Sequence, residues 1–279
     1  MLFKKILLIL VLLLIYSCSS DESVEIDYTL RSDKVLYNDA LLALKKKDFE
    51  IAVELFTELD LQHPYSVWAT KGQLMASFAL YQQNKYDEAI LILSKFINLN
   101  PNSKYLAYAL YLKGFCYYER VSEVTKDQKI TQQAFKAFRE LLNKFPDSKY
   151  SLKAKKHLVL LTNQLAGKEM SIGKYYQKRG NYLAGILRYK EVIQNYKKSA
   201  LTPESLFRLT ECFLSLGINS EAIRMVSILA YNFSNSVWYN DAFNLLQKSK
   251  LNIKSIKEIK ENNLLNLKNV NFDELSLEK

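Results

Sequence analysis

The chain has 279 residues, of which 49% are apolar and 24% charged, so it can bury a sizeable core and is not a disordered polypeptide. Only seven glycines and four prolines occur, which argues against sheets joined by many tight turns and favours long helices. The formal net charge is +10, but the basic residues are interspersed with acidic ones, which favours a solvated basic surface over a nucleic-acid groove.

Residues 1–17 are predicted to be a signal peptide. The positive start MLFKK precedes an apolar run of eleven residues, ILLILVLLLIY, and small residues follow it. The run is shorter than the roughly 20 residues that a membrane-spanning helix needs. A membrane anchor retained as a helix is the alternative interpretation.

Cys18 is the predicted lipidation site. The segment IYSC resembles the lipobox of bacterial lipoproteins, although Ile15 stands where leucine is usual and Tyr16 is bulky. The resemblance implies that Cys18 becomes the first mature residue and carries S-diacylglycerol and N-acyl chains; no other cofactor is expected. Two or more acyl chains make a stable anchor. We therefore expect residues 18–32 to be a lipidated linker and, because Ser19 follows the cysteine, the chain to sit on the periplasmic face of the outer membrane.

One phrase recurs through the chain. HPYSVW, NPNSKY, FPDSKY, YKKSAL and FSNSVW align on five serines at intervals of 37, 45, 51 and 37 residues: Ser66, Ser103, Ser148, Ser199 and Ser236. Proline lacks an N–H and disfavours helix in the preceding residue, whereas serine caps helix starts. The phrase therefore predicts a helix stop followed by a helix start.

A small residue stands twelve places before each proline position, and a large apolar residue follows four places later. The small residues are Ala52, Ala89, Ala134, Gly185 and Ala222, and the large ones are Phe56, Leu93, Phe138, Tyr189 and Val226. A polar turn precedes each small residue. This is the layout of a tetratricopeptide repeat, in which two helices form a hairpin and successive hairpins stack.

The sequence thus predicts an all-α fold, an α-solenoid of five tetratricopeptide hairpins. Repeats 1–3 are expected in residues 33–149 and repeats 4–5 in residues 150–248. No proline interrupts the stretch from Ser148 to Gly180, which predicts one helix of about 30 residues joining repeats three and four. Glu119–Thr131 is expected to form a projecting polar loop, and residues 249–279 a basic, polar tail that is partly helical or disordered.

No pattern of catalytic or metal-binding residues stands out. His63 and His157 have no HExxH or CxxC partner, and no GxSxG, P-loop or GxGxxG occurs. Cys116 and Cys212 fall on apolar helix faces, which favours small core residues over a disulfide. We expect neither a metal site nor an enzyme.

The remaining candidate site is a surface. Tetratricopeptide arrays leave a concave groove lined by the first helix of each hairpin, suited to extended peptides. Groove candidates in the first two repeats are Tyr37, Leu44, Trp68, Phe78 and Tyr81. For each of them, a place in the interhelical core is the alternative.

The segment AGKEMSIGKYYQKRGNYLAGILRYKEVI, Ala166–Ile193, together with FINLNPNSKYLAYALYLKGFCYYE, resembles the BamD (ComL/YfiO-type) family of outer-membrane assembly lipoproteins. The resemblance implies a non-enzymatic subunit of the β-barrel assembly (BAM) machinery. Such a subunit docks on the POTRA region of the barrel protein BamA and helps to receive and insert unfolded outer-membrane β-barrel clients. By the same resemblance, repeats 1–3 form the client-facing half and repeats 4–5 the docking half.

Carried over by position, Arg188 in ILRYKE matches the family arginine that pairs with an acidic residue of BamA, and Tyr175, Tyr176 and Arg179 match its neighbours. The alternative for Arg188 is an exposed helical arginine with an i,i+4 contact. For the whole chain, the alternatives are a generic tetratricopeptide scaffold or pilotin-type periplasmic lipoprotein without BamA binding, and an enzyme acting on peptidoglycan. The last would need a catalytic glutamate or cysteine, and none stands out.

Overall fold

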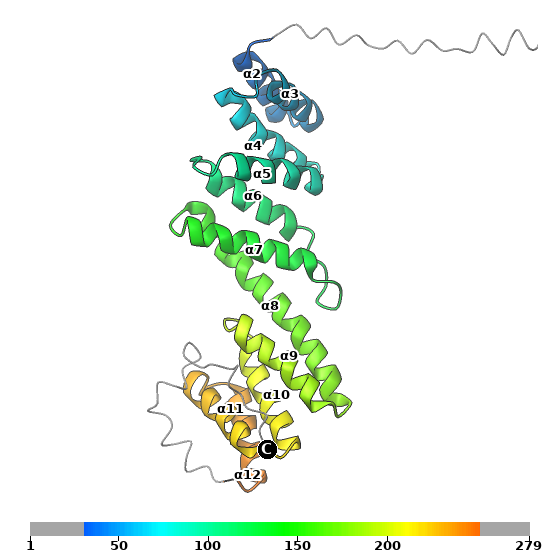
Figure 1. The fold of residues 1–279 in the computed structure, drawn as a ribbon, viewed down its shortest axis with the longest axis vertical. Helices are drawn as coiled ribbons and strands as arrows, with labels where there is room; N and C mark the ends of the chain where they lie inside the picture. The colour runs from blue at the N-terminus through cyan, green and yellow to red at the C-terminus, as the bar shows by residue number, and fades with distance from the viewer. Residues whose placement is uncertain (1–30, 252–279) are drawn as a thin grey trace, which may run out of the picture.

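The computed structural model describes residues 31–251, and every regular element in that range is an α-helix. The helices stack one after another along a single long axis (Figure 1). They are α2 (Asp33–Lys46), α3 (Phe49–Gln62), α4 (Val67–Gln82), α5 (Tyr86–Leu99), α6 (Leu106–Tyr118), α7 (Lys129–Lys144), α8 (Lys149–Lys178), α9 (Tyr182–Asn195), α10 (Thr202–Ser215), α11 (Asn219–Asn232) and α12 (Val237–Lys248). The predicted signal peptide, Cys18, most of the linker and nearly all of the tail lie outside the described residues.

Consecutive helices pair as hairpins, and each hairpin packs on the next. The pairs are α2/α3, α4/α5, α6/α7, α8/α9 and α10/α11, and α12 then packs on α10 and α11. The prediction of an all-α tetratricopeptide solenoid is confirmed. The five hairpins are compatible with the five predicted repeats.

The small-and-large pattern builds the hairpins as expected. The small residue of each repeat is buried at the helix crossing, and the large residues Phe56, Leu93, Phe138, Tyr189 and Val226 are all at most 1% exposed. Small residues let the helix backbones approach, and the large side chain fills the space beyond the crossing.

Three of the five recurring serines cap helices as predicted, and two do not. The hydroxyls of Ser66, Ser148 and Ser236 accept backbone N–H bonds at the starts of α4, α8 and α12. Ser103 and Ser199 instead accept from the residue two places on, at 3.2 and 3.1 Å, and the helix begins one residue after that. In these two repeats the serine organises the turn rather than the helix end.

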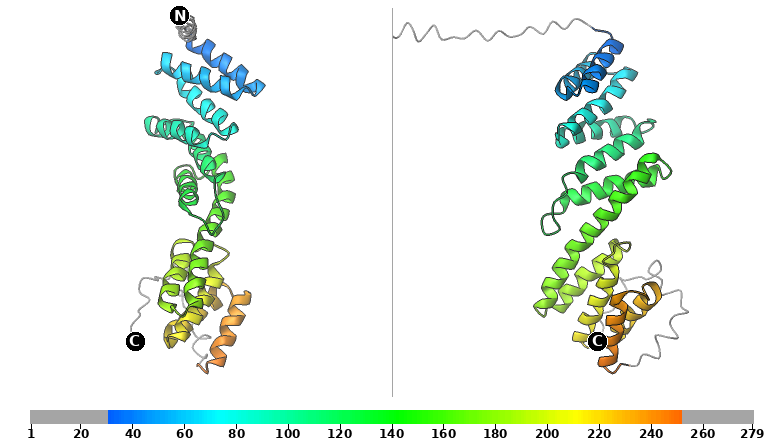
Figure 2. Two further views of the ribbon diagram at one scale, coloured as in Figure 1. Left: turned by 90° about the vertical axis from the view of Figure 1, so that its right-hand side faces the viewer. Right: turned by 180° about the vertical axis from the view of Figure 1, so that it is seen from behind.

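The long helix α8 has 30 residues, as predicted, and a length of about 45 Å. It packs against α6 and α7 of the third hairpin and against α9 of the fourth. Figure 2 shows it crossing from the third hairpin into the fourth without a break. It therefore belongs to both halves.

The segment between α6 and α7 is bound to α8 rather than projecting freely. Gln164 Nε2 donates to the carbonyl of Ser122, and Lys168 Nζ to the carbonyl of Thr125, each at 2.7 Å. Buried Gln128 donates its side-chain amide to three carbonyls of the segment itself. The expected polar insertion is present, but it is fastened to the helix that joins the two halves.

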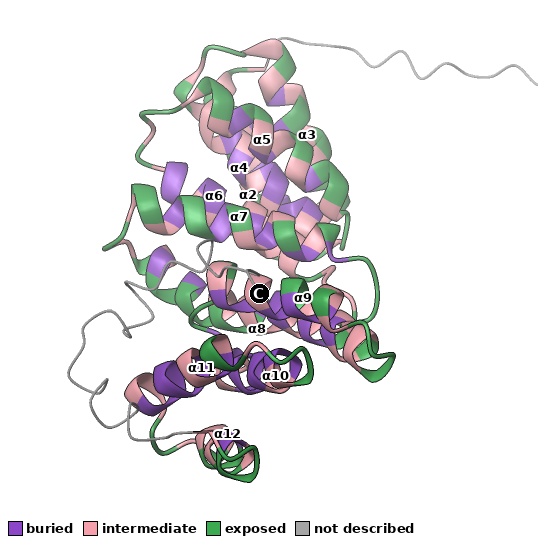
Figure 3. Cartoon of the chain, turned by 60° about the horizontal axis from the view of Figure 1, so that its bottom comes forward, coloured by how far each residue is buried: buried purple, intermediate pink, exposed green. Residues whose placement is uncertain are grey.

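The core is divided along the array. One large apolar cluster extends from α8 to α12, and three smaller ones serve the N-terminal half. Buried residues lie on the faces where helices meet, most densely on α10 and α11 (Figure 3). Cys116 and Cys212 are fully buried free thiols in these clusters, so their prediction as core residues is confirmed.

Candidate functional site

The predicted docking residues all lie on the hairpin formed by α8 and α9. Arg188 is exposed on α9, and Tyr175, Tyr176 and Arg179 lie at the C-terminal end of α8. The structure thus places the four residues on one hairpin. They do not form a single cluster of contacts.

Arg188 is paired across the two helices. Its Nη1 donates to Glu169 Oε2 of α8 at 3.1 Å, and the side chains are 45% and 19% exposed, respectively. Spacing along one helix cannot reveal this pair, because the two residues are 19 apart in sequence. An ion pair this accessible contributes little to stability. It engages one nitrogen of a guanidinium group that has five N–H donors, so donors remain for a second carboxylate.

Tyr175 and Arg179 form a pair of their own. The Arg179 guanidinium lies 4.5 Å from the centroid of the Tyr175 ring, and that side chain is 51% exposed. Tyr176 packs edge-on against Tyr175 at 5.6 Å. Tyr176 comes two helical turns after Glu169 and shares its face of α8, whereas Tyr175 and Arg179 point about 100° away.

Two leucines beside Arg188 were not predicted as surface residues. Leu183 and Leu187 of α9 are 50% and 64% exposed. They are four residues apart and so lie on the same face of the helix. The sequence signal was present in YLAGILRYK, but an apolar residue within an amphipathic helix is normally assigned to the core.

The predicted groove residues are half-buried and stacked between repeats. Tyr37 of α2 lies 4.8 Å from Trp68 of α4, and Tyr81 of α4 lies 5.7 Å from Phe115 of α6, measured between ring centroids. Phe78 stacks on Tyr81. Leu44 packs on the first apolar cluster. Tyr37, Trp68 and Tyr81 therefore link neighbouring hairpins, and all five side chains remain partly accessible.

The partly exposed rings of Tyr37, Trp68, Phe78, Tyr81 and Phe115 are called the aromatic row. The row continues further than the sequence indicated. Tyr108 and Tyr111 of α6 both contact Tyr150 of α8, at 5.4 and 5.6 Å. Burial raises the pKa of Tyr81 to about 12, and the nearby Glu119 carboxylate adds to the effect. Burial likewise raises the pKa of Tyr108 far above its usual value. These phenols stay neutral at physiological pH, so the row is an uncharged, largely apolar surface.

The two histidines are engaged in packing and turn contacts. His63 Nε2 lies 2.7 Å from the carbonyl oxygen of Arg31. His157 stacks on Phe138, and burial lowers its pKa, which keeps the ring neutral. Within residues 31–251, no three His, Cys, Asp or Glu side chains gather as metal ligands. In the same range, no helix combines the length and apolarity needed to cross a membrane.

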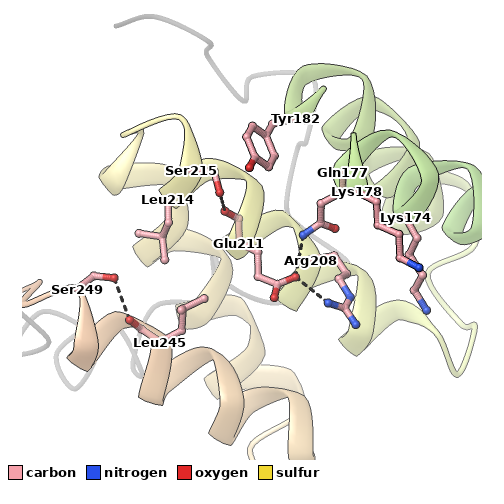
Figure 4. A pocket seen from close by; sticks show the side chains of 10 residues that line it. All are labelled: Lys174, Gln177, Lys178, Tyr182, Arg208, Glu211, Leu214, Ser215, Leu245 and Ser249. Atoms are coloured by element: carbon pink, nitrogen blue, oxygen red, sulfur yellow. Dashed lines mark hydrogen bonds and ion pairs between the residues drawn. The ribbon is translucent and has the colours of Figure 1, made fainter. Parts of the chain in front are cut away.

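A cavity of about 620 Å³ lies between the end of α8, α10 and α12 (Figure 4). Glu211 is the central acceptor of its lining: its Oε2 accepts from Gln177 and from Arg208, each at 2.9 Å. Burial alone would lower the pKa of Arg208, but Glu211 and Glu204 outweigh it and raise that pKa. These contacts of Glu211 join α8 to α10 across the cavity.

A family model described as "Outer membrane lipoprotein", YfiO, matches residues 30–228. The chain belongs to the YfiO family. The match begins just before α2 and ends within α11, so it includes the α8–α9 hairpin and the aromatic row.

YfiO-family relatives cover most of the chain. "Outer membrane protein assembly factor BamD" of Caulobacter vibrioides is 41% identical over 80% of this chain and 73% of its own length. The protein of the same name from Rickettsia prowazekii is 39% identical over 76% of this chain and 84% of its own. The one from Neisseria meningitidis serogroup A is 32% identical over 86% and 95%.

Proposed function

We propose that this chain is a lipid-anchored, non-enzymatic subunit of the machinery that assembles β-barrel proteins in the outer membrane. Membership of the YfiO family, with relatives named outer membrane protein assembly factors, carries the proposal. The stacked hairpins support it, because such arrays expose long surfaces for protein partners. Lipidation at Cys18 provides the attachment to the membrane.

The α8–α9 hairpin is the proposed docking face for the POTRA region of a BamA-like barrel protein. Arg188 offers a planar fork that can grip a partner carboxylate, and exposed Leu183 and Leu187 supply apolar area beside it. Tyr175 and Arg179 form an adjoining face near the end of α8, about 100° further round that helix. Aromatic residues and arginine at such positions carry much of the energy of protein interfaces.

Arg188→Glu tests the docking face. We expect the full-length tagged variant, purified in mild detergent, to recover at least about tenfold less of the co-purifying barrel protein than the wild type does. The new carboxylate faces Glu169 and repels the partner's acidic residue. Arg139→Glu on α7 removes another exposed helical arginine and should leave recovery unchanged. Normal recovery with the Arg188 variant would contradict the docking face alone. Absence of any POTRA-bearing partner from the folded wild-type chain would contradict the assembly role and favour a generic scaffold.

The aromatic row on α2, α4 and α6 is the proposed receiving surface for clients. The final strand of such a client is extended and apolar, and the neutral half-exposed rings offer matching contacts.

We expect a peptide with an apolar, aromatic-ended client sequence to bind about fivefold more weakly to Trp68→Ala than to the wild type. Trp238→Ala is a matched control, since Trp238 follows the last serine cap as Trp68 follows Ser66. Equal binding of the peptide and a scrambled version to the wild-type chain would contradict client recognition.

A further inference from the structure

Around the turn between α3 and α4, three apolar side chains within seven residues are exposed. Leu61 is 76% exposed, Tyr65 100% and Val67 70%. We call these three residues the first-turn patch. Exposed aliphatic and aromatic groups gathered in this way need a physical reason.

The chain itself shows that the turn does not require them. The two following proline turns have the same backbone hydrogen bond, from the serine N–H to the carbonyl three residues before it, at 2.9, 3.1 and 3.1 Å in the three turns. At the three patch positions those turns carry only polar, exposed residues: Asn98, Asn102 and Lys104, then Asn143, Asp147 and Lys149. The backbone of this turn therefore does not require apolar residues at the three positions, although the last recurring turn also carries an exposed valine, Val237.

The patch lies where the described chain begins. His63 of the turn contacts the carbonyl of Arg31, and Ser66 donates to Asp33 Oδ2 at 2.5 Å. The nearby Glu58 carboxylate accepts from Arg31 at 2.6 Å. The segment that leads back to Cys18 therefore joins the array directly beside the patch, at the α2–α3 end in Figure 1, and the neighbouring carboxylates are already partnered.

We propose that the first-turn patch is a second membrane contact, inserted among the lipid headgroups of the leaflet that holds the lipid anchor. The inference rests on the proposed anchor at Cys18. Thirteen residue steps separate Cys18 from Arg31, so Arg31, which contacts the turn of the patch, stays within about 45 Å of the lipidated residue. Tyrosine is favoured at the membrane–water interface, and aliphatic side chains bury there to about 5–10 Å. A lipid chain alone leaves the array free to swivel, whereas a second contact fixes which end faces the bilayer.

Site-specific labelling tests the contact in the full lipidated chain. Tyr65→Cys carries an environment-sensitive fluorophore, while Cys116 and Cys212 stay unlabelled because burial hides them and raises the pKa of each thiol to about 12. The chain is placed in vesicles of phosphatidylethanolamine and phosphatidylglycerol containing a nitroxide lipid. We expect at least threefold stronger quenching at position 65 than with the same label at Asn102→Cys or Asp147→Cys. Equal quenching at the three positions would overturn the proposal.

A second variant separates the patch from the label. Leu61→Asn with Val67→Lys, made in the chain labelled at position 65, installs the residues of the next turn and should reduce the quenching at least twofold with unchanged helical circular dichroism. Unchanged quenching would show that the fluorophore inserts by itself and would overturn the proposal.

Mass spectrometry of the wild-type chain tests the anchor independently. A Cys18 without acyl chains would remove the anchor and this inference together, whereas an acylated chain with an unquenched position 65 would contradict the patch only.

Discussion

Phe138→Ala is expected to lower the free energy of unfolding by about 3–5 kcal/mol, the cost of emptying a well-packed aromatic site. The Phe138 ring is fully buried between α6, α7 and α8. It stacks on His157 at 5.6 Å and lies 6.1 Å from Tyr111. These neighbours are themselves held by other rings, so the site cannot collapse to fill the cavity. Urea denaturation, monitored by circular dichroism, should show a lower midpoint for the variant, and that decrease measures the lost stability.

Phe135→Ala is the matched control on the same helix. Phe135 is only half-buried and contacts Tyr196 and Arg139 at the surface of the array. Its removal should lower the free energy of unfolding by less than about 1.5 kcal/mol, because the Phe135 ring buries little apolar surface when the chain folds. Similar losses for the two variants would contradict the assignment of Phe138 to the core of the third hairpin.

Gly173→Val is expected to destabilise the C-terminal half by about 2–3 kcal/mol through overpacking. A Cβ at Gly173 would lie 2.5 Å from Cε1 and 2.8 Å from Cδ1 of Tyr189. The ring cannot turn aside, because it is fully buried and its hydroxyl donates to Gln177 at 2.7 Å. Hydrogen exchange should show the loss of protection concentrated in α8–α10.

Gly167→Ala, six residues earlier in the same helix, provides the contrast. There a Cβ would meet the side chain of Val124 at 3.3 Å, in the segment between α6 and α7, and that of Leu201 at 3.7 Å, an ordinary contact. Alanine gains up to about 1 kcal/mol of helix propensity over glycine, so the net change should stay within about 1 kcal/mol of zero. If Gly167→Ala were as damaging as Gly173→Val, the specific clash with Tyr189 would not be the cause.

Sequence reasoning predicted the hairpins because their signals are local and repeated. The proline–serine phrase marks each turn, and the small-and-large pair marks each crossing, so Ala134 with Phe138 or Ala52 with Phe56 can be located without a structure. The length of α8 followed from the absence of any stop signal between Ser148 and Gly180. Each of these predictions needs only the neighbours along the chain.

The features that sequence reasoning missed all depend on contacts between distant residues. Gly173 looks like a weak point in a helix, and only the position of the Tyr189 ring shows why a larger residue is excluded. The partner of Arg188 comes from another helix. Leu183 and Leu187 satisfy the pattern of a buried face, although the next hairpin does not cover them. The docking and client assignments remain predictions that the experiments above can decide.

Because the two halves share helix α8, the number of residues in that helix determines how the halves are oriented relative to each other. Each residue inserted into or deleted from the middle of an α-helix turns everything beyond it by about 100° and shifts it by about 1.5 Å. A change of one residue near the centre of α8 would therefore swing the Arg188 face to another side of the array. The turns between the other hairpins can absorb added length, whereas α8 cannot, so its 30 residues set the angle between the proposed client-receiving and docking surfaces.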